Sequence, residues 1–331
     1  MKTAIVTGSC GYIGSVLCKM LIENEYQPVI GIDKAEQRHP YMTFYRNDFD
    51  SRHPYMTFYR NDFDSDIKHI LDCYPEATVF HLAANSLLGP SHNDPLSYFS
   101  NNTVKTLNLI KLLKPTNRLI FASTAAVYAE TDEIITENSR LAPPNNYGLS
   151  KLFTEQMLDS YCKIGGITAI SFRFFNVIGA YGDVGQKRGT PHVVNKLCEA
   201  AYDNSKFQIY GNDWDTRDGT CIRDYVNVQD ICRAMIHADD QNVIPQTADH
   251  LKYNLGTMTG TSVKELVDVF RGLVKDIGIE YVDRRPGDPA KLIADPTKFI
   301  NDTNFQYKFD NNDLPEMVYD AWQYFESEGI Y

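Results

Sequence analysis

The chain lacks several features that would assign it to a specialised class of protein. Its seven cysteines include no Cys-x-x-Cys pair, which argues against a disulfide framework or a metal site and favours a reducing compartment. Acidic residues outnumber basic ones, 43 to 32, so a nucleic-acid or anionic-membrane partner is not expected. No apolar run approaches a membrane span, and the first expected strand begins at residue 2, leaving no signal peptide. We therefore expect a cytoplasmic protein.

The opening stretch, residues 2–15, carries the strongest pattern. A short apolar run ends in a turn with three glycines, Gly8, Gly11 and Gly14, and apolar residues at helical spacing follow. A strand, glycine turn and helix in this order predict a dinucleotide site, because the glycines allow close backbone approach and the helix N-terminus offers free N–H groups. A second strand ends in Asp33. That carboxylate would bind ribose hydroxyls and repel a 2′-phosphate, which favours NAD over NADP.

The rest of the chain indicates an α/β protein. Strand and helix patterns alternate as far as about residue 176, which predicts a doubly wound parallel sheet. Further strands are expected at 78–84, 118–124 and 168–175, and helices at about 95–113 and from 146. We expect an NAD-binding Rossmann domain over 1–178, with a segment of about 226–258 returning to it, and a smaller C-terminal α/β substrate domain mainly over 179–331.

Residues 38–51 and 52–65 are the same fourteen-residue string, RHPYMTFYRNDFDS, in tandem. Two copies of so short a unit cannot form a solenoid. We interpret them as a local duplication, natural or introduced. Only one copy can provide the third strand, and the second copy runs directly into an acid-capped helix start. We therefore place the strand at 56–60, treat the first copy as a surface excursion, and expect Asp62 rather than Asp48 to face an adenine.

Four polar residues have the spacing expected of a catalytic group. Tyr147 and Lys151 lie four residues apart in a predicted helix, hence on one face. A tyrosine needs about 4 kcal/mol to become a base near neutral pH, and one positive charge about 4 Å away in a partly buried site supplies about that much. Lys151 next to the positively charged nicotinamide ring of NAD could therefore make Tyr147 an acid–base group. Ser123 and Thr124 end the preceding strand, at the edge where such sheets bind ligands. A hydroxyl there could bind the substrate oxygen whose proton Tyr147 takes.

Taken together, these motifs resemble the extended short-chain dehydrogenase/reductase family. Phe-Phe-Asn-Val-Ile-Gly-Ala from Phe174, Asp-Gly-Thr-Cys-Ile-Arg-Asp-Tyr over 218–225 and Arg-Pro-Gly-Asp-Pro from Arg285 narrow the resemblance to the UDP-glucose 4-epimerases. It covers almost the whole chain except one copy of the duplication. It implies NAD as cofactor and a homodimer through helices near 96–113 and 146–163. It also implies interconversion of UDP-glucose and UDP-galactose by oxidation at C4, rotation of the 4-keto sugar and re-reduction.

The resemblance also implies binding residues, position by position. NAD would be held by Gly8, Gly11, Tyr12, Ile13, Gly14, Asp33, Asp62, Phe63, Leu82, Ala83, Ala84, Ser86, Asn101, Tyr147, Lys151 and Phe175. The UDP-sugar would be held by Thr124, Asn176, His192, Phe207, Arg223, Tyr225, Arg285, Asp288 and Leu292. The two arginines agree with residue chemistry, since a diphosphate needs guanidinium partners.

Several positions bear on the alternatives. Ser86 stands where several family members carry a lysine, and Asn227 replaces the usual histidine. Leu292 occupies the position that limits the C2 substituent, so hexose, N-acetylhexosamine and pentose forms of the sugar all stay open. A nucleotide-sugar dehydratase would carry an Asp-Glu after Thr124, where this chain has two alanines. A net dehydrogenase would release NADH, and a non-catalytic NAD-binding protein would not need the Thr–Tyr–Lys set. We expect a 4-epimerase.

Overall fold

A computed structural model of the chain describes residues 2–34, 44–45, 56–60, 62–63, 67–240, 249–285 and 287–328. It consists of two compact units. The first comprises Met1–Val127, Asn145–Arg173 and Cys232–Tyr253, and the second comprises Tyr128–Pro144, Phe174–Ile231 and Asn254–Tyr331. Tyr128–Pro144 thus lie in the second unit although they fall inside the 1–178 range expected for the first domain. The domain boundaries as separately folding parts stay a prediction.

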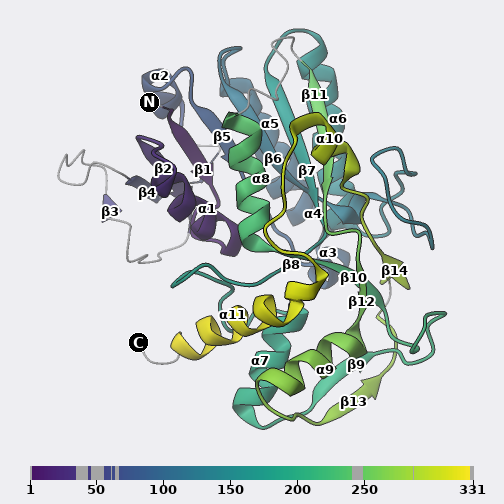
Figure 1. Cartoon of the computed structure of the whole chain (residues 1–331). Helices are drawn as coiled ribbons and strands as arrows, with labels where there is room; N and C mark the ends of the chain where they lie inside the picture. The colour runs from purple at the N-terminus through teal and green to yellow at the C-terminus, as the bar shows by residue number, and fades with distance from the viewer. Residues whose placement is uncertain are drawn as a thin grey trace. The chain divides into compact units, whose positions relative to one another are not determined.

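The first unit is built on a parallel sheet. Its strands are β1 (Ala4–Thr7), β2 (Val29–Asp33), β3 (Phe44–Tyr45), β4 (Met56–Arg60), β5 (Thr78–His81), β6 (Arg118–Thr124), β7 (Thr168–Phe174) and β11 (His250–Leu255). They lie in the order β11-β7-β6-β5-β1-β2-β4-β3, and β1 pairs parallel with both β2 and β5 (Figure 1). The chain therefore leaves β1 in one direction and returns to start again at β5, which confirms the doubly wound fold. The carboxyl ends of β1 and β5 meet where the direction reverses, the place where such sheets bind ligands.

Helices cover both faces of this sheet. They are α1 (Tyr12–Glu23), α2 (Lys68–Cys73), α3 (Leu88–Asn93), α4 (Pro95–Tyr98), the π-helix η1 (Phe99–Val104), α5 (Lys105–Leu112), the 3-10 turn η2 (Ala125–Val127), α6 (Asn146–Lys163) and α8 (Val228–Asp240). Apolar residues of α2, α5 and α6, such as Ile70, Leu109 and Leu158, form one buried cluster with Ile5 and Phe121 of the sheet. Figure 1 shows α1 and α8 on the opposite face.

The duplicated segment enters the sheet twice. The second copy forms β4, parallel to β2, as expected. The expectation that the first copy stays outside the sheet is wrong, because Phe44–Tyr45 form β3 parallel to β4, opposite Phe58 and Tyr59. Each of these two residues pairs with its own counterpart in the other copy. Asp48 and the acid-capped helix start at Asp64 lie outside the described residues.

The second unit is organised around β10 (Ile222–Asn227). Its other elements are β8 (Asn176–Ile178), α7 (Val193–Asp203), β9 (Phe207–Tyr210), β12 (Gly260–Ser262), α9 (Val263–Leu273), β13 (Ile279–Val282), β14 (Lys291–Leu292), α10 (Thr297–Thr303), η3 (Asn311–Asp313) and α11 (Leu314–Ser327). β10 pairs with β8, β12 and β14, and β9 pairs with β13. Helices α7, α9 and α11 share one apolar core. Across both units, no helix within the described ranges combines the length and hydropathy needed to cross a bilayer.

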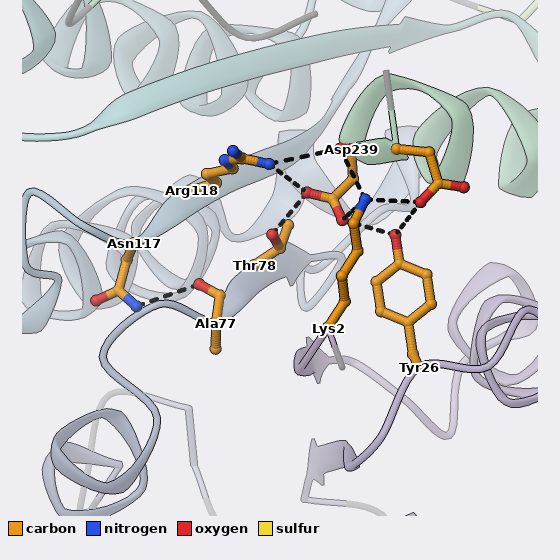
Figure 2. Close-up of polar contacts among 8 residues, drawn as sticks. Lys2, Tyr26, Ala77, Thr78, Asn117, Arg118 and Asp239 are labelled. Atoms are coloured by element: carbon orange, nitrogen blue, oxygen red, sulfur yellow. Dashed lines mark hydrogen bonds and ion pairs between the residues drawn. The ribbon is translucent and has the colours of Figure 1, made fainter. Parts of the chain in front are cut away.

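A single buried carboxylate fixes the amino ends of three strands in the first unit (Figure 2). Asp239, near the end of α8, accepts hydrogen bonds from Tyr26 Oη at 2.6 Å and Thr78 Oγ1 at 2.7 Å. Its oxygens also lie 3.4 Å from a nitrogen of Arg118 and 3.5 Å from Lys2 Nζ. Because Asp239 is 1% exposed, these donors replace its lost hydration. Thr78 and Arg118 begin β5 and β6, and Lys2 precedes β1, so the contact tightens the sheet at its amino edge.

We predict that Asp239→Ala lowers the free energy of unfolding by about 3 kcal/mol, because it leaves buried donors unpaired. Urea unfolding followed by circular dichroism measures this. Asp240→Ala is the matched control: its carboxylate is 45% exposed and should contribute less than about 1 kcal/mol. Equal losses from the two substitutions would contradict the role given to Asp239.

Candidate active site

The turn after β1 and the start of α1 have no room for a side chain at Gly8 and Gly14. Gly8 has a φ of +72°, and a Cβ there would lie 2.7 Å from the backbone nitrogen of Ala83. A Cβ on Gly14 would lie 2.1 Å from the carbonyl oxygen of Gly8. Gly11, which has no side chain to cap the helix, is the N-cap of α1. Bare backbone followed at once by a helix N-terminus fits the pyrophosphate of NAD.

The residues expected beside this turn lie next to it. Tyr12 and Ile13 are the first two residues of α1. Asp33 ends β2, and its carboxylate accepts a hydrogen bond from the backbone N–H of Cys10 at 2.9 Å. This contact holds the acidic residue against the glycine turn, where a ribose attached to the pyrophosphate would lie.

The two residues expected at the adenine have different surroundings. Asp62 is paired with Lys34 at 2.7 Å and also with Lys105. Burial opposes the ionisation of Asp62, but the hydrogen bonds from these lysines hold its pKa below the usual range. The ring of Phe63 is buried in the core, 4.8 Å from the ring of His81. A ring contact of Phe63 with adenine is therefore not supported, and any contact there would come from its backbone.

A buried histidine that the sequence did not single out ties β5 to its neighbours. His81 Nδ1 lies 2.6 Å from Thr7 Oγ1, and Nε2 lies 2.8 Å from Thr106 Oγ1. Burial, with a smaller contribution from the charge of Lys151, lowers the pKa of His81 to about 3, so the ring is neutral. The backbone N–H of Leu82 donates to the carbonyl of Thr7 at 3.1 Å. The expected cofactor residues Leu82, Ala83 and Ala84 thus begin directly beside the glycine turn.

The π-helix η1 positions the segment that follows. Asn102, which is 1% exposed, accepts the backbone N–H of Asn85 at 2.8 Å and donates to the Asn85 carbonyl at 2.9 Å and to Ser150 Oγ at 3.0 Å. Asn101 reaches the Asn85 side chain at 3.4 Å, and Ser86 is exposed. Asn102 was missed. The available signal was an Asn-Asn pair inside a helix, where asparagine is unfavourable unless its amide has a partner, and π-helical turns are frequent at functional sites.

Helix α6 delivers the predicted acid–base pair to the end of β6. Asn145 caps the helix through its side chain. The Tyr147 hydroxyl interacts with the side chain of Thr124, the last residue of β6. Lys151 Nζ, one turn further along, donates to the carbonyl of Ala122 at 2.7 Å in the interior. The structure therefore brings Thr124, Tyr147 and Lys151 to one place.

Burial governs the ionisation of this pair. It raises the pKa of Tyr147 to about 12, although the Thr124 hydrogen bond opposes the shift. It lowers the pKa of Lys151 to about 7, an effect that the charge of Glu155 opposes. The lowered tyrosine pKa expected from the sequence is thus not found in the protein alone. That expectation included the positive charge of a bound nicotinamide, which is the remaining source of such a shift.

Ser123, predicted as catalytic beside Thr124, is turned into the interior. Its hydroxyl donates to Glu155 Oε1 at 2.6 Å, and the residue is 2% exposed. Ser123 is therefore not offered to a substrate. Glu155 and its partner Arg173 were not predicted, although Glu155 continues the four-residue spacing of Tyr147 and Lys151.

The second unit contains both of the arginines predicted from the sequence, Arg223 and Arg285. Arg223 pairs with Leu292 across β10 and β14, so these two residues are neighbours. Arg223 donates to a backbone carbonyl at 2.8 Å, and its Nη2 lies 3.9 Å from Asp288. The guanidinium carbon of Arg285 lies 3.8 Å from the ring centre of Tyr210. Contacts of this kind hold the planar groups in fixed orientations.

The remaining predicted residues are mostly buried. Asn176 pairs with Tyr225 across β8 and β10. The Tyr225 hydroxyl is enclosed, with no partner among the described residues. His192, in contrast, is exposed and is the N-cap of α7. Phe175 is buried and donates its N–H to a backbone carbonyl at 3.1 Å. Phe207 lies in the apolar core, so its ring serves packing rather than substrate contact.

We predict that Gly14→Ala weakens NAD binding at least about tenfold, because the new Cβ forces the turn away from Gly8. Calorimetric titration with NAD measures the change. Gly89→Ala is the control, since nothing lies within 4 Å of a Cβ there. The glycine turn is not the NAD cradle if both variants bind NAD like the unmodified chain.

The chain is similar to known proteins over nearly its whole length. The profile of the NAD dependent epimerase/dehydratase family matches residues 4–256. The UDP-glucose 4-epimerase of Corynebacterium glutamicum is 33% identical, over 98% of this chain and 96% of that protein. The crystal structure of UDP-glucose 4-epimerase from Brucella ovis in complex with NAD superposes with a TM-score of 0.86 at 30% identity, covering 98% of each chain. The UDP-Glc/GlcNAc 4-epimerase from Campylobacter jejuni gives 0.80 at 30% identity, over 99% of this chain and 100% of that one. The chain belongs to the NAD dependent epimerase/dehydratase family.

Proposed function

We propose that this chain is an isomerase that interconverts UDP-glucose and UDP-galactose, with a role in galactose metabolism. The observation that carries the proposal is the interaction of the Thr124 and Tyr147 side chains at the end of β6, with Lys151 buried one turn away. This group can remove and return the proton of one sugar hydroxyl. The names of the relatives from Corynebacterium glutamicum and Brucella ovis support the choice of substrate.

The roles follow from the contacts. NAD, when bound, supplies the hydride acceptor and donor for C4 of the sugar. Tyr147 takes the proton of the 4′-hydroxyl and later returns it, while Thr124 hydrogen-bonds the same oxygen. Lys151 stabilises the tyrosine when it is ionised, because its charge is buried and weakly screened. Gly8, Gly11 and Gly14 offer backbone to the pyrophosphate, and Asp33 offers its carboxylate to the ribose.

The 4-keto sugar must rotate between oxidation and re-reduction. The UDP part must therefore be bound firmly, and the hexose pocket must be large enough for the sugar to rotate. Arg223 and Arg285 hold the diphosphate in this proposal, since guanidinium groups match phosphate geometry. Leu292, the neighbour of Arg223, limits the space at C2. Its intermediate size, together with the name of the Campylobacter jejuni relative, supports N-acetylhexosamine as a second substrate. A pentose is the further alternative.

A dehydratase receives no support from the residues after β6. The turn η2 consists of Ala125–Val127, and these side chains carry no carboxylic acid for the elimination of water. Thr124 and Tyr147, in contrast, have the contact that an epimerase needs. A non-catalytic NAD-binding protein would have no use for that contact.

The first experiment is incubation of the purified chain with UDP-galactose without added cofactor, followed by separation of the products. We expect UDP-glucose to form without accumulation of NADH absorbance. Tyr147→Phe should lower kcat roughly 10²–10⁴-fold, because the acid–base group is removed. Tyr161→Phe, on the same helix, should retain activity. If the unmodified chain does not convert UDP-galactose even with added NAD, the hexose assignment is wrong and UDP-pentoses are tested next.

We further propose that the enzyme is a cytoplasmic homodimer. Around the predicted contact helices, Leu96 is 77% exposed, Val104 51% and Phe153 41%, and Phe153 stacks on Phe99 at 5.7 Å. Exposed large apolar side chains on helices that pack against one another, as α4, η1 and α6 do, are typical of an interface. The seven cysteine side chains are thiols rather than disulfides, as a reducing compartment would keep them.

We predict that Leu96→Glu converts the dimer to a monomer, because the new charge would be buried in the interface. Sedimentation velocity measures the mass in solution. Ile164→Glu, at a residue that is 79% exposed but lies beyond the end of α6, should leave the mass unchanged. A monomeric unmodified chain, or a dimer that survives Leu96→Glu, contradicts this interface.

A further inference from the structure

A fully buried ion pair lies behind the acid–base group. Glu155 and Arg173 are each 1% exposed. Arg173 Nε lies 3.0 Å from Glu155 Oε1, and Arg173 Nη2 lies 2.6 Å from Oε2. Such a pair stabilises a protein little, because two charges lose their hydration, and apolar residues of similar volume often do as well. Its presence here therefore calls for an explanation other than packing.

Glu155 and Lys151 of α6 both bind the end of β6, next to Thr124. Glu155 Oε1 accepts the hydroxyl of Ser123 at 2.6 Å, and Ser123 is bonded to Thr124 in β6. Lys151, one turn before Glu155 on α6, donates to the carbonyl on the other side of Ser123 at 2.7 Å. The end of β6 is thus fixed by two side chains of the same helix face.

We propose that Glu155, held by Arg173, is a positioning residue that fixes the end of β6 through Ser123 and places a negative charge one helical turn from Lys151. This inference rests on the proposed function, because it assigns Glu155 a part in the chemistry of Tyr147 and Thr124. Glu155 does not touch the sugar, and it acts through its neighbours.

The charges around Lys151 make the second role specific. Lys151 Nζ lies 4.6 Å from the ring centre of Phe121. The titratable or charged groups that face the Lys151–Glu155 region within the described residues are Tyr147 and Glu155 of α6, His81 of β5, Tyr98 of α4, Arg173 of β7 and His250 of β11. Among these, Glu155 is the group that raises the pKa of Lys151, while burial lowers it to about 7. Without Glu155 the amine would lose the charge that raises its pKa, and it would release its proton at lower pH.

We predict that Glu155→Gln moves the alkaline limb of the kcat profile for UDP-galactose down by about one pH unit, because the upward effect of the Glu155 charge on the pKa of Lys151 is lost. Glu155→Asp keeps the charge but cannot reach Ser123, so kcat should fall while the alkaline limb stays in place. Ser123→Ala removes one hydrogen bond and no charge, and should likewise lower kcat with KM unchanged. Gln156→Ala, at the exposed neighbouring position on α6, should match the unmodified chain in every measurement.

The outcomes separate the two roles. An unmoved limb in Glu155→Gln overturns the charge role, and unmodified kcat in both Glu155→Asp and Ser123→Ala overturns the positioning role. If Glu155→Gln does not fold, the kcat values of Glu155→Asp and Ser123→Ala alone test the positioning role. An NMR titration of labelled lysine reads the protonation of Lys151 without turnover. A lower midpoint in Glu155→Gln supports the charge role even if the unmodified chain proves inactive on UDP-galactose, in which case it is the proposed function that fails.

Discussion

The close approach of two backbone turns is the constraint on which the first unit depends. The turn after β1 contacts the segment after β5 at Gly8, and the start of α1 presses on the same turn at Gly14. A methyl group at either position would occupy space that backbone already fills. The position of α1, the direction of its N-terminus and the path of residues 82–84 therefore all follow from the absence of two side chains. Asp33 and His81 then lock β2 and β5 to this arrangement through Cys10 and Thr7.

Helix α6 is the second organising element. Residues of α6 at four-residue spacing lie on one face but make different contacts, because each lies about 6 Å further along the helix axis. Tyr147 meets Thr124, Lys151 meets the backbone of β6, and Glu155 meets Ser123 and Arg173. The outermost residue is the one with access to a substrate, and the innermost is enclosed. One face of α6 thus extends from the acid–base residue Tyr147 to the buried residue Glu155.

Local pattern was enough to find the parts of the site that depend on nearby residues. The glycine turn, the acidic end of β2 and the Tyr–Lys pair each lie within a few turns of chain, where spacing determines geometry. The hydroxyl pair after β6 shows the limit. Both Ser123 and Thr124 end the same strand, but only the tertiary partners decide which hydroxyl meets Tyr147 and which is bonded to Glu155. Asn102 and His81 were missed for the same reason, since their partners come from distant segments.

The strands β3 and β4 show how a parallel sheet can gain a strand by copying. In a parallel pair both neighbours need the same alternation of side chains toward the two faces, and a duplicate has that alternation from the outset. Here the register places Phe44 opposite Phe58 and Tyr45 opposite Tyr59, so each residue of one copy lies opposite the same residue of the other copy. Strand β4 pairs with β2 along one edge, and along its other edge it pairs with β3, its duplicate. Tandem duplication can therefore extend the rim of such a fold before any residue in the new strand has changed.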